Sequence, residues 1–112
     1  MKQHATRIET LEPGEVARLL EAGTLLLIDV REPSEYANDS IHGSLQYPLS
    51  TFDAATLPSD GPRQLVFHCG TGKRSLTAAE RRLAAGQTTA SHMKGGLAAW
   101  KAAGLPVIAP VP

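Results

Sequence analysis

Cys69 is the only cysteine among the 112 residues, and it lies in the segment FHCGTGKRSLTAAERRLAAG. It follows the apolar run QLVFH and precedes a turn that contains Gly70, Gly72, Lys73 and Arg74. A glycine-rich turn after a strand can direct successive backbone N–H groups at one point, and the start of a following helix adds further unpaired N–H groups. Such surroundings, with cations nearby, favour thiolate over thiol. The pattern therefore predicts an ionised, reactive Cys69 that holds a small anionic group.

The alternative interpretation is that Cys69 is a small buried apolar residue, as free cysteines often are. That interpretation explains the cysteine but not the loop after it, so we favour a catalytic thiolate. The residues expected to bind the substrate are Gly70, Thr71, Gly72, Lys73, Arg74 and Ser75. Lys73 could instead be a solvated surface charge. Arg74 could pair with an acid such as Asp29 or Glu35 and brace the loop.

Three related motifs do not fit this loop. A phosphate-binding P-loop needs glycine where the chain has Phe67, and serine or threonine where it has Arg74. A dinucleotide-binding fingerprint needs a third glycine at the position of Ser75. A cysteine phosphatase loop of the form Cys-x5-Arg needs arginine at that same position, whereas Arg74 comes one step earlier. The shorter loop makes a smaller cradle, which is poorly suited to a tetrahedral phosphoryl group.

A second polar group follows the apolar run TLLLIDV. Asp29 and Arg31 come at the end of this predicted strand, and we expect them to support the site by anchoring loop backbone or pairing with an opposite charge. His68 directly precedes the cysteine. Because neighbouring strand residues point to opposite faces, His68 is expected to pack under the loop and not to act as a base. Trp100 is expected in the core.

The composition argues against several function classes. Eleven acidic and eleven basic residues give no net charge, so nucleic acid and membrane surfaces are not expected partners. The lone cysteine and four scattered histidines predict no metal site, and no cofactor is expected. No segment approaches the roughly 20 apolar residues needed to cross a bilayer. Because a single cysteine cannot form an internal disulfide and the first residues do not resemble a signal peptide, we expect a cytoplasmic protein.

Helical and strand patterns alternate along the chain. We expect helices in 16–23, 32–39, 75–86 and 96–104, and strands in 24–30, 44–50, 64–68 and 90–93. This short alternation predicts a single α/β domain, with a largely parallel sheet and helices on both faces. Ligands of such sheets bind beyond the carboxyl ends of the strands, which is where Cys69 is expected.

Three segments, in order, resemble the rhodanese (sulfurtransferase) family. They are LLLIDVREPSEYANDSIHGSLQYPL, FHCGTGKRS and GGLAAWKAAGLPV. The likeness extends from about Ile8 to Val107, and we take 8–109 as the domain. It implies a rhodanese fold of the single-domain type, with a central, mainly parallel sheet of about five strands. The six-residue loop from Cys69 to Arg74 has the length of the sulfurtransferase branch, one residue shorter than in the related phosphatases.

The resemblance also implies an enzyme. Cys69 would attack the outer sulfur of thiosulfate or of a protein persulfide, become a persulfide itself, and pass the sulfur to cyanide, a thiol or another acceptor, which could be a protein. The N–H groups of the loop would hold the anionic persulfide. Two alternatives stay open. One is a non-catalytic binding or regulatory module on the same fold, and the other is a thiol-dependent phosphatase or arsenate reductase, which the loop length argues against.

One segment departs from the family pattern. Where the family often has His-Ile-Pro-Gly, this chain has Ser40, Ile41, His42 and Gly43. Ser40 can still hydrogen-bond locally, so the departure concerns the geometry of this turn and not the cysteine. The proline-spaced tail IAPVP is expected to be extended, as a natural end or as the start of a linker to a further domain or membrane segment.

Overall fold

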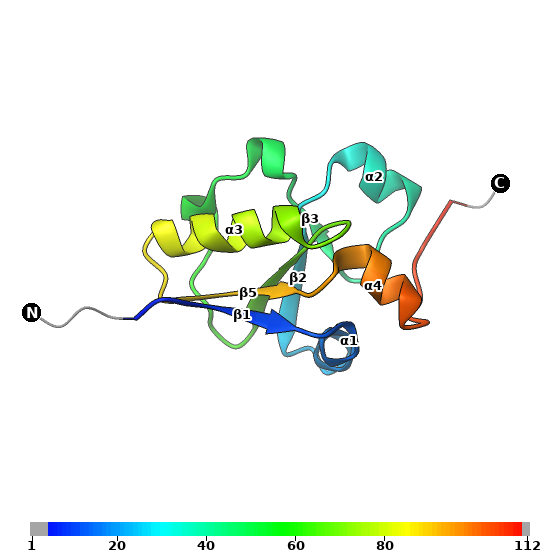
Figure 1. The fold of residues 1–112 in the computed structure, drawn as a ribbon, viewed down its shortest axis with the longest axis horizontal. Coiled ribbons are helices and arrows are strands. Elements are labelled where there is room, and N and C mark those ends of the chain that lie inside the picture. The colour runs from blue at the N-terminus through cyan, green and yellow to red at the C-terminus, as the bar shows by residue number, and fades with distance from the viewer. Residues whose placement is uncertain (1–4, 111–112) are drawn as a thin grey trace, which may run out of the picture.

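The apolar runs TLLLIDV and QLVFH form the adjacent strands β2 (Leu25–Asp29) and β4 (Gln64–His68). The computed structural model describes residues 5–110, and its five parallel strands lie in the order β1-β5-β4-β2-β3 (Figure 1). The other strands are β1 (Arg7–Leu11), β3 (Leu45–Gln46) and β5 (Thr89–Met93). Strands that are covered on both faces need continuous apolar sequence, which is why these two runs lie inside the sheet. The predicted α/β class with a five-stranded parallel sheet is confirmed.

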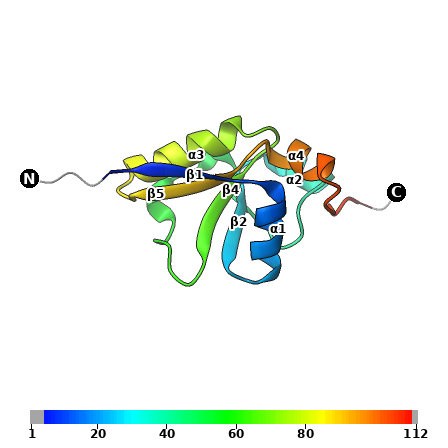
Figure 2. The same cartoon turned by 60° about the horizontal axis from the view of Figure 1, so that its bottom comes forward.

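Helices cover both faces of the sheet. They are α1 (Pro13–Glu21), α2 (Pro33–Asn38), α3 (Lys73–Ala84) and α4 (Gly96–Ala102), with 3₁₀ helices η1 (Leu49–Thr51) and η2 (Ala54–Thr56). On one face, α1 and α4 share a core with Leu27, Val66 and Trp100. On the other, α3 packs its alanines against Phe67 and its neighbours. Figures 1 and 2 show α3 and α1 on opposite sides of the sheet. No helix within residues 5–110 is long and apolar enough to cross a membrane.

Three features differ from the sequence-based expectation. The strand expected in 44–50 is confined to β3 (Leu45–Gln46), and the chain after Pro48 forms η1 (Leu49–Thr51) instead. The strand β1 was not expected, because RIETL mixes charged and apolar residues; it lies at an edge of the sheet, where only Leu11 is buried. The helix expected to start near Ser75 begins two residues earlier, at Lys73. Gly72 precedes it with a φ of 107°, a conformation open to glycine, so the chain turns directly from the loop into the helix.

Gly96, the first residue of α4, lies against the cysteine loop, and we predict that it tolerates no side chain. Its φ is 61°, and a Cβ there would lie 2.5 Å from the carbonyl oxygen of Cys69 and 2.6 Å from the carbonyl carbon of Gly70. Backbone atoms cannot rotate out of the way, so Gly96→Ala should lower the free energy of unfolding by about 2–5 kcal/mol in urea denaturation. Gly61→Ala is the control, because nothing lies within 4 Å of a Cβ there. Equal losses in both variants would contradict the prediction.

Candidate active site

The loop between β4 and α3 is held by the first turn of α4. The Leu97 N–H donates to the Cys69 carbonyl at 2.7 Å, and the Ala98 N–H donates to the Gly70 carbonyl at 3.0 Å. These bonds satisfy N–H groups that have no partner inside a helix. Because the C=O and N–H of a trans peptide point in opposite directions, the N–H groups that follow these two carbonyls face away from α4. The docking of α4 therefore sets the direction of the N–H groups of Gly70 and Thr71, at the start of the loop.

Backbone N–H groups of the loop point at the sulfur of Cys69. The nitrogen of Gly72 lies 3.1 Å from Sγ and that of Ser75 lies 3.3 Å from it. Ser75 is in the first turn of α3, so its N–H has no partner within the helix. The loop geometry that the glycine pattern predicts is therefore present. Binding of a substrate by residues 70–75 stays a prediction.

The same N–H groups control the charge of the cysteine. Cys69 is 1% exposed, and burial by itself raises the pKa of its thiol. Hydrogen bonds from Ser75 and from the backbone of Gly72 and Thr71 outweigh burial, so the pKa lies below its ordinary value. Because so little of the residue is exposed, a reagent must be small, or the loop must open, for the sulfur to be attacked.

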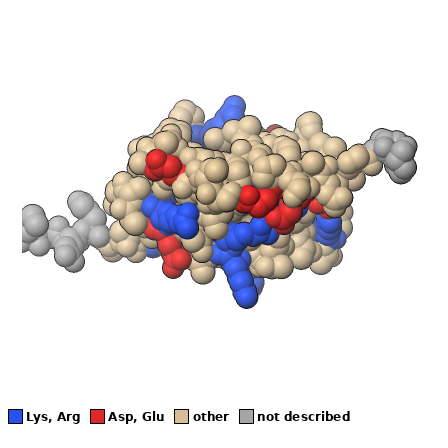
Figure 3. All heavy atoms as spheres, turned by 90° about the horizontal axis from the view of Figure 1, so that it is seen from above, with Lys and Arg blue, Asp and Glu red and all other residues tan. Residues whose placement is uncertain are grey.

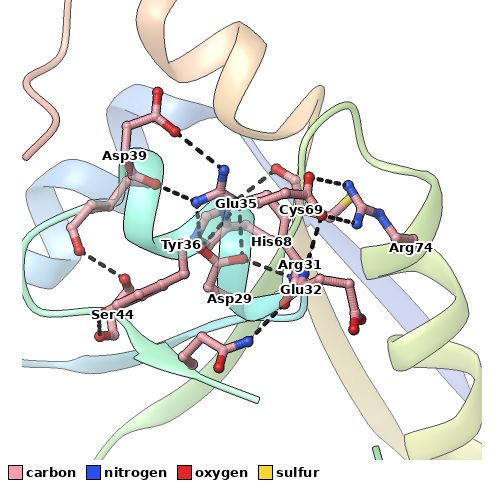
Figure 4. Close-up of polar contacts among 12 residues, drawn as sticks. Asp29, Arg31, Glu32, Glu35, Tyr36, Asp39, Ser44, His68, Cys69 and Arg74 are labelled. Carbon is pink, nitrogen blue, oxygen red and sulfur yellow. Dashed lines mark hydrogen bonds and ion pairs between the residues drawn. The ribbon is translucent and has the colours of Figure 1, made fainter. Parts of the chain in front are cut away.

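Arg74 pairs with Glu35, one of the two acids considered from the sequence. Its Nη1 and Nη2 donate to the two carboxylate oxygens at 2.7 and 3.0 Å (Figure 4). Glu35 also accepts a hydrogen bond from the N–H of Glu32 at the start of α2, at 3.1 Å. Arg74 therefore ties the loop and α3 to α2. Direct contact of Arg74 with a substrate stays a prediction, and any such contact would be made by a guanidinium that already has a carboxylate partner.

Asp29 and Arg31 form a buried ion pair beyond the end of β2. The Arg31 Nη2 donates to Oδ2 of Asp29 at 2.8 Å, and the Arg31 N–H donates to Oδ1 at 2.9 Å. Arg31 also donates to the carbonyl of Asp39 at 2.6 Å, and the Asp39 carboxylate pairs with Lys101 of α4. These contacts join β2, the end of α2 and α4. They agree with our interpretation of Asp29 and Arg31 as supporting residues, which remains an interpretation.

His68 and Trp100 lie where the sequence pattern places them. His68 is fully buried, with Nδ1 3.4 Å from the Cys69 carbonyl and Nε2 3.5 Å from Oδ2 of Asp29. Burial holds the pKa of His68 below its ordinary value, which favours the neutral ring. Trp100 packs in the core, and its Nε1 donates to the carbonyl of Pro106 at 2.9 Å.

Thr71 and Lys73 are the exposed residues of the loop. Lys73 takes part in none of the ion pairs found within residues 5–110, so its charge is available to an anion. Figure 3 shows acidic and basic side chains mixed on one face of the molecule, in keeping with the zero net charge. A pocket of about 390 Å³ adjoins the loop at Gly70 and is lined by α2 and α4. Its polar lining residues are Arg31, Glu35, Asn38, Asp39 and Lys101.

The segment 40–43, which departs from the family pattern, is hydrogen-bonded to the chain at Ile108. Ser40 and Ile108 exchange two backbone hydrogen bonds, from Ser40 N to Ile108 O at 2.9 Å and from Ile108 N to Ser40 O at 2.8 Å. Gly43 has a φ of 88°, and His42 is exposed. Serine and histidine at these positions therefore leave an ordered turn.

Two residues contact the predicted site although sequence reasoning did not select them. His92 places Nδ1 3.0 Å from Oγ of Ser75, which is 17 residues earlier in the chain. Asp39 pairs with Arg31 through its carboxylate and accepts a hydrogen bond from Arg31 at its carbonyl, as described above. No local spacing links either residue to the cysteine. For His92, the one available signal was its position near the end of the predicted strand 90–93, because the carboxyl ends of parallel strands meet at one edge of the sheet.

We predict that the Arg74–Glu35 pair stabilises the fold only above acidic pH. Arg74 lowers the pKa of Glu35 to about 2 in the folded protein, from an ordinary value of 4.5. A lowered folded-state pKa contributes stability that is complete above pH 4.5 and is lost as the pH falls through about 2. Because both side chains are more than a third exposed, Glu35→Gln should cost about 0.2–1 kcal/mol at neutral pH. Urea denaturation at several pH values should show the difference from the parent shrinking towards pH 2; a constant difference would contradict it.

Comparison with known proteins identifies the family of this chain. The model of the rhodanese-like domain family matches residues 12–103. An uncharacterised protein of Synechocystis is 34% identical over 88% of this chain, which spans only 55% of that protein. A sulfurtransferase of Allochromatium vinosum is 34% identical over 83% of this chain and 87% of its own length. A Rhodopseudomonas palustris structure, described as of unknown function and a possible tyrosine phosphatase, has a TM-score of 0.77 at 27% identity, over 96% of this chain and 99% of its own. These matches support a sulfurtransferase in general, and the chain belongs to the rhodanese-like domain family.

Proposed function

We propose that this protein is a rhodanese-type sulfurtransferase that carries sulfane sulfur on Cys69. The observation that carries the proposal is the pair of N–H groups, from Gly72 and Ser75, directed at Sγ at 3.1 and 3.3 Å. Donors in this arrangement stabilise negative charge on the sulfur before any substrate arrives. A residue that is a thiolate at rest needs no general base to become a nucleophile.

In the first half of the reaction, the thiolate of Cys69 attacks the outer sulfur of thiosulfate or of a persulfide. A new S–S bond forms, the old one breaks, and sulfite or a thiolate leaves with the electron pair. The outer sulfur of the resulting Cys69 persulfide is again an anion that the loop N–H groups can hold. Lys73, the exposed cation of the loop, is suited to attract the donor and to offset the charge of departing sulfite.

In the second half, a thiophilic acceptor such as cyanide or a thiol attacks the outer sulfur and releases the Cys69 thiolate. Neither half consumes a proton or needs a redox cofactor, so the residues of the loop suffice for the chemistry. The low exposure of Cys69, at 1%, favours donors as small as thiosulfate over bulky ones. We also propose a cytoplasmic location, where a single cysteine stays reduced.

Two other functions make different demands on the loop. A non-catalytic module does not need a cysteine with a lowered pKa, which this chain has. A thiol-dependent phosphatase or arsenate reductase must surround a tetrahedral oxyanion, and here the arginine comes at position 74, already paired with Glu35. The likeness to a possible tyrosine phosphatase makes a phosphatase assay a necessary control.

We predict that thiosulfate adds one sulfur atom to Cys69. After incubation with excess thiosulfate and desalting, the intact mass should rise by the mass of one sulfur, and cyanide should return the mass to its starting value while thiocyanate is released. Cys69→Ser should show neither change. Because the chain has one cysteine, no other thiol can account for the gain.

The outcome that rejects this proposal is a parent protein whose mass stays unchanged with thiosulfate and with a small persulfide such as glutathione persulfide. Hydrolysis of a generic aryl phosphate that depends on Cys69 would instead support the phosphatase alternative. A folded protein that is inert in both assays would support the binding module.

A further inference from the structure

The ion pair between Arg74 and Glu35 engages the one arginine of the cysteine loop. Arg74 donates from Nη1 and Nη2 to the two carboxylate oxygens of Glu35, at 2.7 and 3.0 Å (Figure 4). A guanidinium that donates from two nitrogens presents to a carboxylate the same fork that it presents to other oxyanions. The carboxylate of Glu35 therefore stands where an anion bound by Arg74 would stand.

The guanidinium of Arg74 lies beside the backbone that follows the candidate nucleophile. A Cβ built on Gly70, the residue next to Cys69, would lie 3.3 Å from Nη2 of Arg74. Gly70 and Glu35 both line the pocket of about 390 Å³ that adjoins the loop, whereas Arg74 is not among the lining residues in the described part of the chain. A molecule in this pocket therefore meets Glu35 before it meets the guanidinium that is paired with it.

The other cations around the pocket are held differently. Arg31 and Lys101 share the carboxylate of Asp39, and the Arg31 side chain is only 4% exposed. The side chains of Arg74 and Glu35 are 36% and 38% exposed, and neither has another ion-pair partner among residues 5–110. Because exposed ion pairs contribute little stability, an anion can replace Glu35 at Arg74 without leaving a buried charge unpaired.

We propose that Glu35 is a specificity-determining residue, which occupies Arg74 as an internal anion and thereby lowers the affinity of the loop for anionic sulfur donors. An oxyanion such as thiosulfate reaches Arg74 only by displacing the carboxylate, and this displacement subtracts from its binding free energy. A donor without an oxyanion group requires no displacement, so Glu35 shifts the preference of the site towards donors of low charge. The inference deepens the proposed function, on which it rests for the class of donor.

The test is a titration with sulfate, an unreactive tetrahedral dianion, at constant ionic strength, followed by the NMR signals of the backbone amides of residues 70–75. Glutamine has the shape of glutamate, and its amide oxygen can keep the hydrogen bond from the N–H of Glu32. Glu35→Gln should lower the dissociation constant of sulfate about two- to fivefold, the range of an exposed ion pair. The control is Glu80→Gln, which removes the same charge at an exposed residue of α3 that takes part in no ion pair within residues 5–110. It should leave the dissociation constant unchanged.

Coupling to Arg74 shows whether Glu35 acts by occupying the guanidinium or only by its own charge. In an Arg74→Gln background, Glu35→Gln should lose most of its effect on sulfate binding, because no guanidinium is left to release. An effect that persists in full in that background would overturn the proposal. So would an unchanged dissociation constant in Glu35→Gln, an equal decrease in Glu80→Gln, or sulfate that binds neither the parent nor Glu35→Gln.

A measurement on the parent protein covers the case in which Glu35→Gln does not fold. The N–H of Glu32 donates to the carboxylate of Glu35 at 3.1 Å, so its NMR signal reports the position of that carboxylate. During the sulfate titration, this signal and the Nε–H signal of Arg74 should shift with the same midpoint as the loop amides. Loop signals that shift while these two stay constant would mean that sulfate binds without displacing Glu35, and would overturn the proposal.

The sulfate titration uses no sulfur donor and no turnover, so the two proposals fail separately. A protein that binds sulfate as predicted but accepts no sulfur from thiosulfate or a persulfide would reject the proposed function and leave the competition between Glu35 and an anion standing. A protein that accepts sulfur but whose sulfate binding does not depend on Glu35 would reject this inference alone.

Discussion

The direction in which the loop peptides face is the constraint on which the rest of the site depends. Two N–H groups at the start of α4 donate to the carbonyls of Cys69 and Gly70. This turns those carbonyl oxygens away from the sulfur and fixes the peptide that carries the Thr71 N–H, which makes one of the hydrogen bonds that lower the pKa of Cys69. A loop of the same sequence with its peptides reversed would place carbonyl oxygens against the thiol and raise its pKa. The close approach of α4 requires Gly96, where a Cβ would overlap the loop backbone. Gly96 and the cysteine loop, which are far apart in sequence, therefore depend on each other.

Negative charge on the Cys69 sulfur is stabilised mainly by the fixed dipoles of backbone N–H groups. The sequence places cations beside the cysteine, yet Arg74 is engaged by Glu35 and Arg31 by Asp29 and Asp39. Within each pair the opposite charges neutralise each other. Together the pairs join α2, α3, α4 and the end of β2 around the loop. The groups left to stabilise charge on the Cys69 sulfur are the N–H groups of the loop backbone. Such donors are already oriented before the charge develops, so they stabilise an anion with little reorganisation. Lys73 is exposed at the surface, and the proposed function assigns to its charge the attraction of a small anionic donor.

The sequence predicted the parts of the molecule that local rules control. Continuous apolar runs identified the buried strands β2 and β4, and glycines next to Cys69 predicted the loop that surrounds the sulfur. Local rules were weaker at β1, whose mixed residues suit an edge, and at the start of α3, which Gly72 moved to Lys73. The partners of Arg74 and Ser75 depend on how distant segments pack. The sequence offered both Asp29 and Glu35 as partners for Arg74 and gave no reason to choose between them. No spacing along the chain links His92 to Ser75. The contact of His92 depends on the register of β5 against β1 and β4, and that of Arg74 depends on the packing of α2 beside α3. Single-sequence patterns contain neither.

The central claim is that the folded loop keeps Cys69 ionised more readily than an ordinary cysteine, despite burial. The most direct measurement compares the apparent pKa of Cys69 in the folded protein with that in the same chain unfolded in denaturant, by thiolate absorbance. The chain has no second cysteine to confuse the signal. We predict a lower pKa of Cys69 in the folded protein. An equal or higher value would mean that burial outweighs the loop N–H groups, and would contradict it.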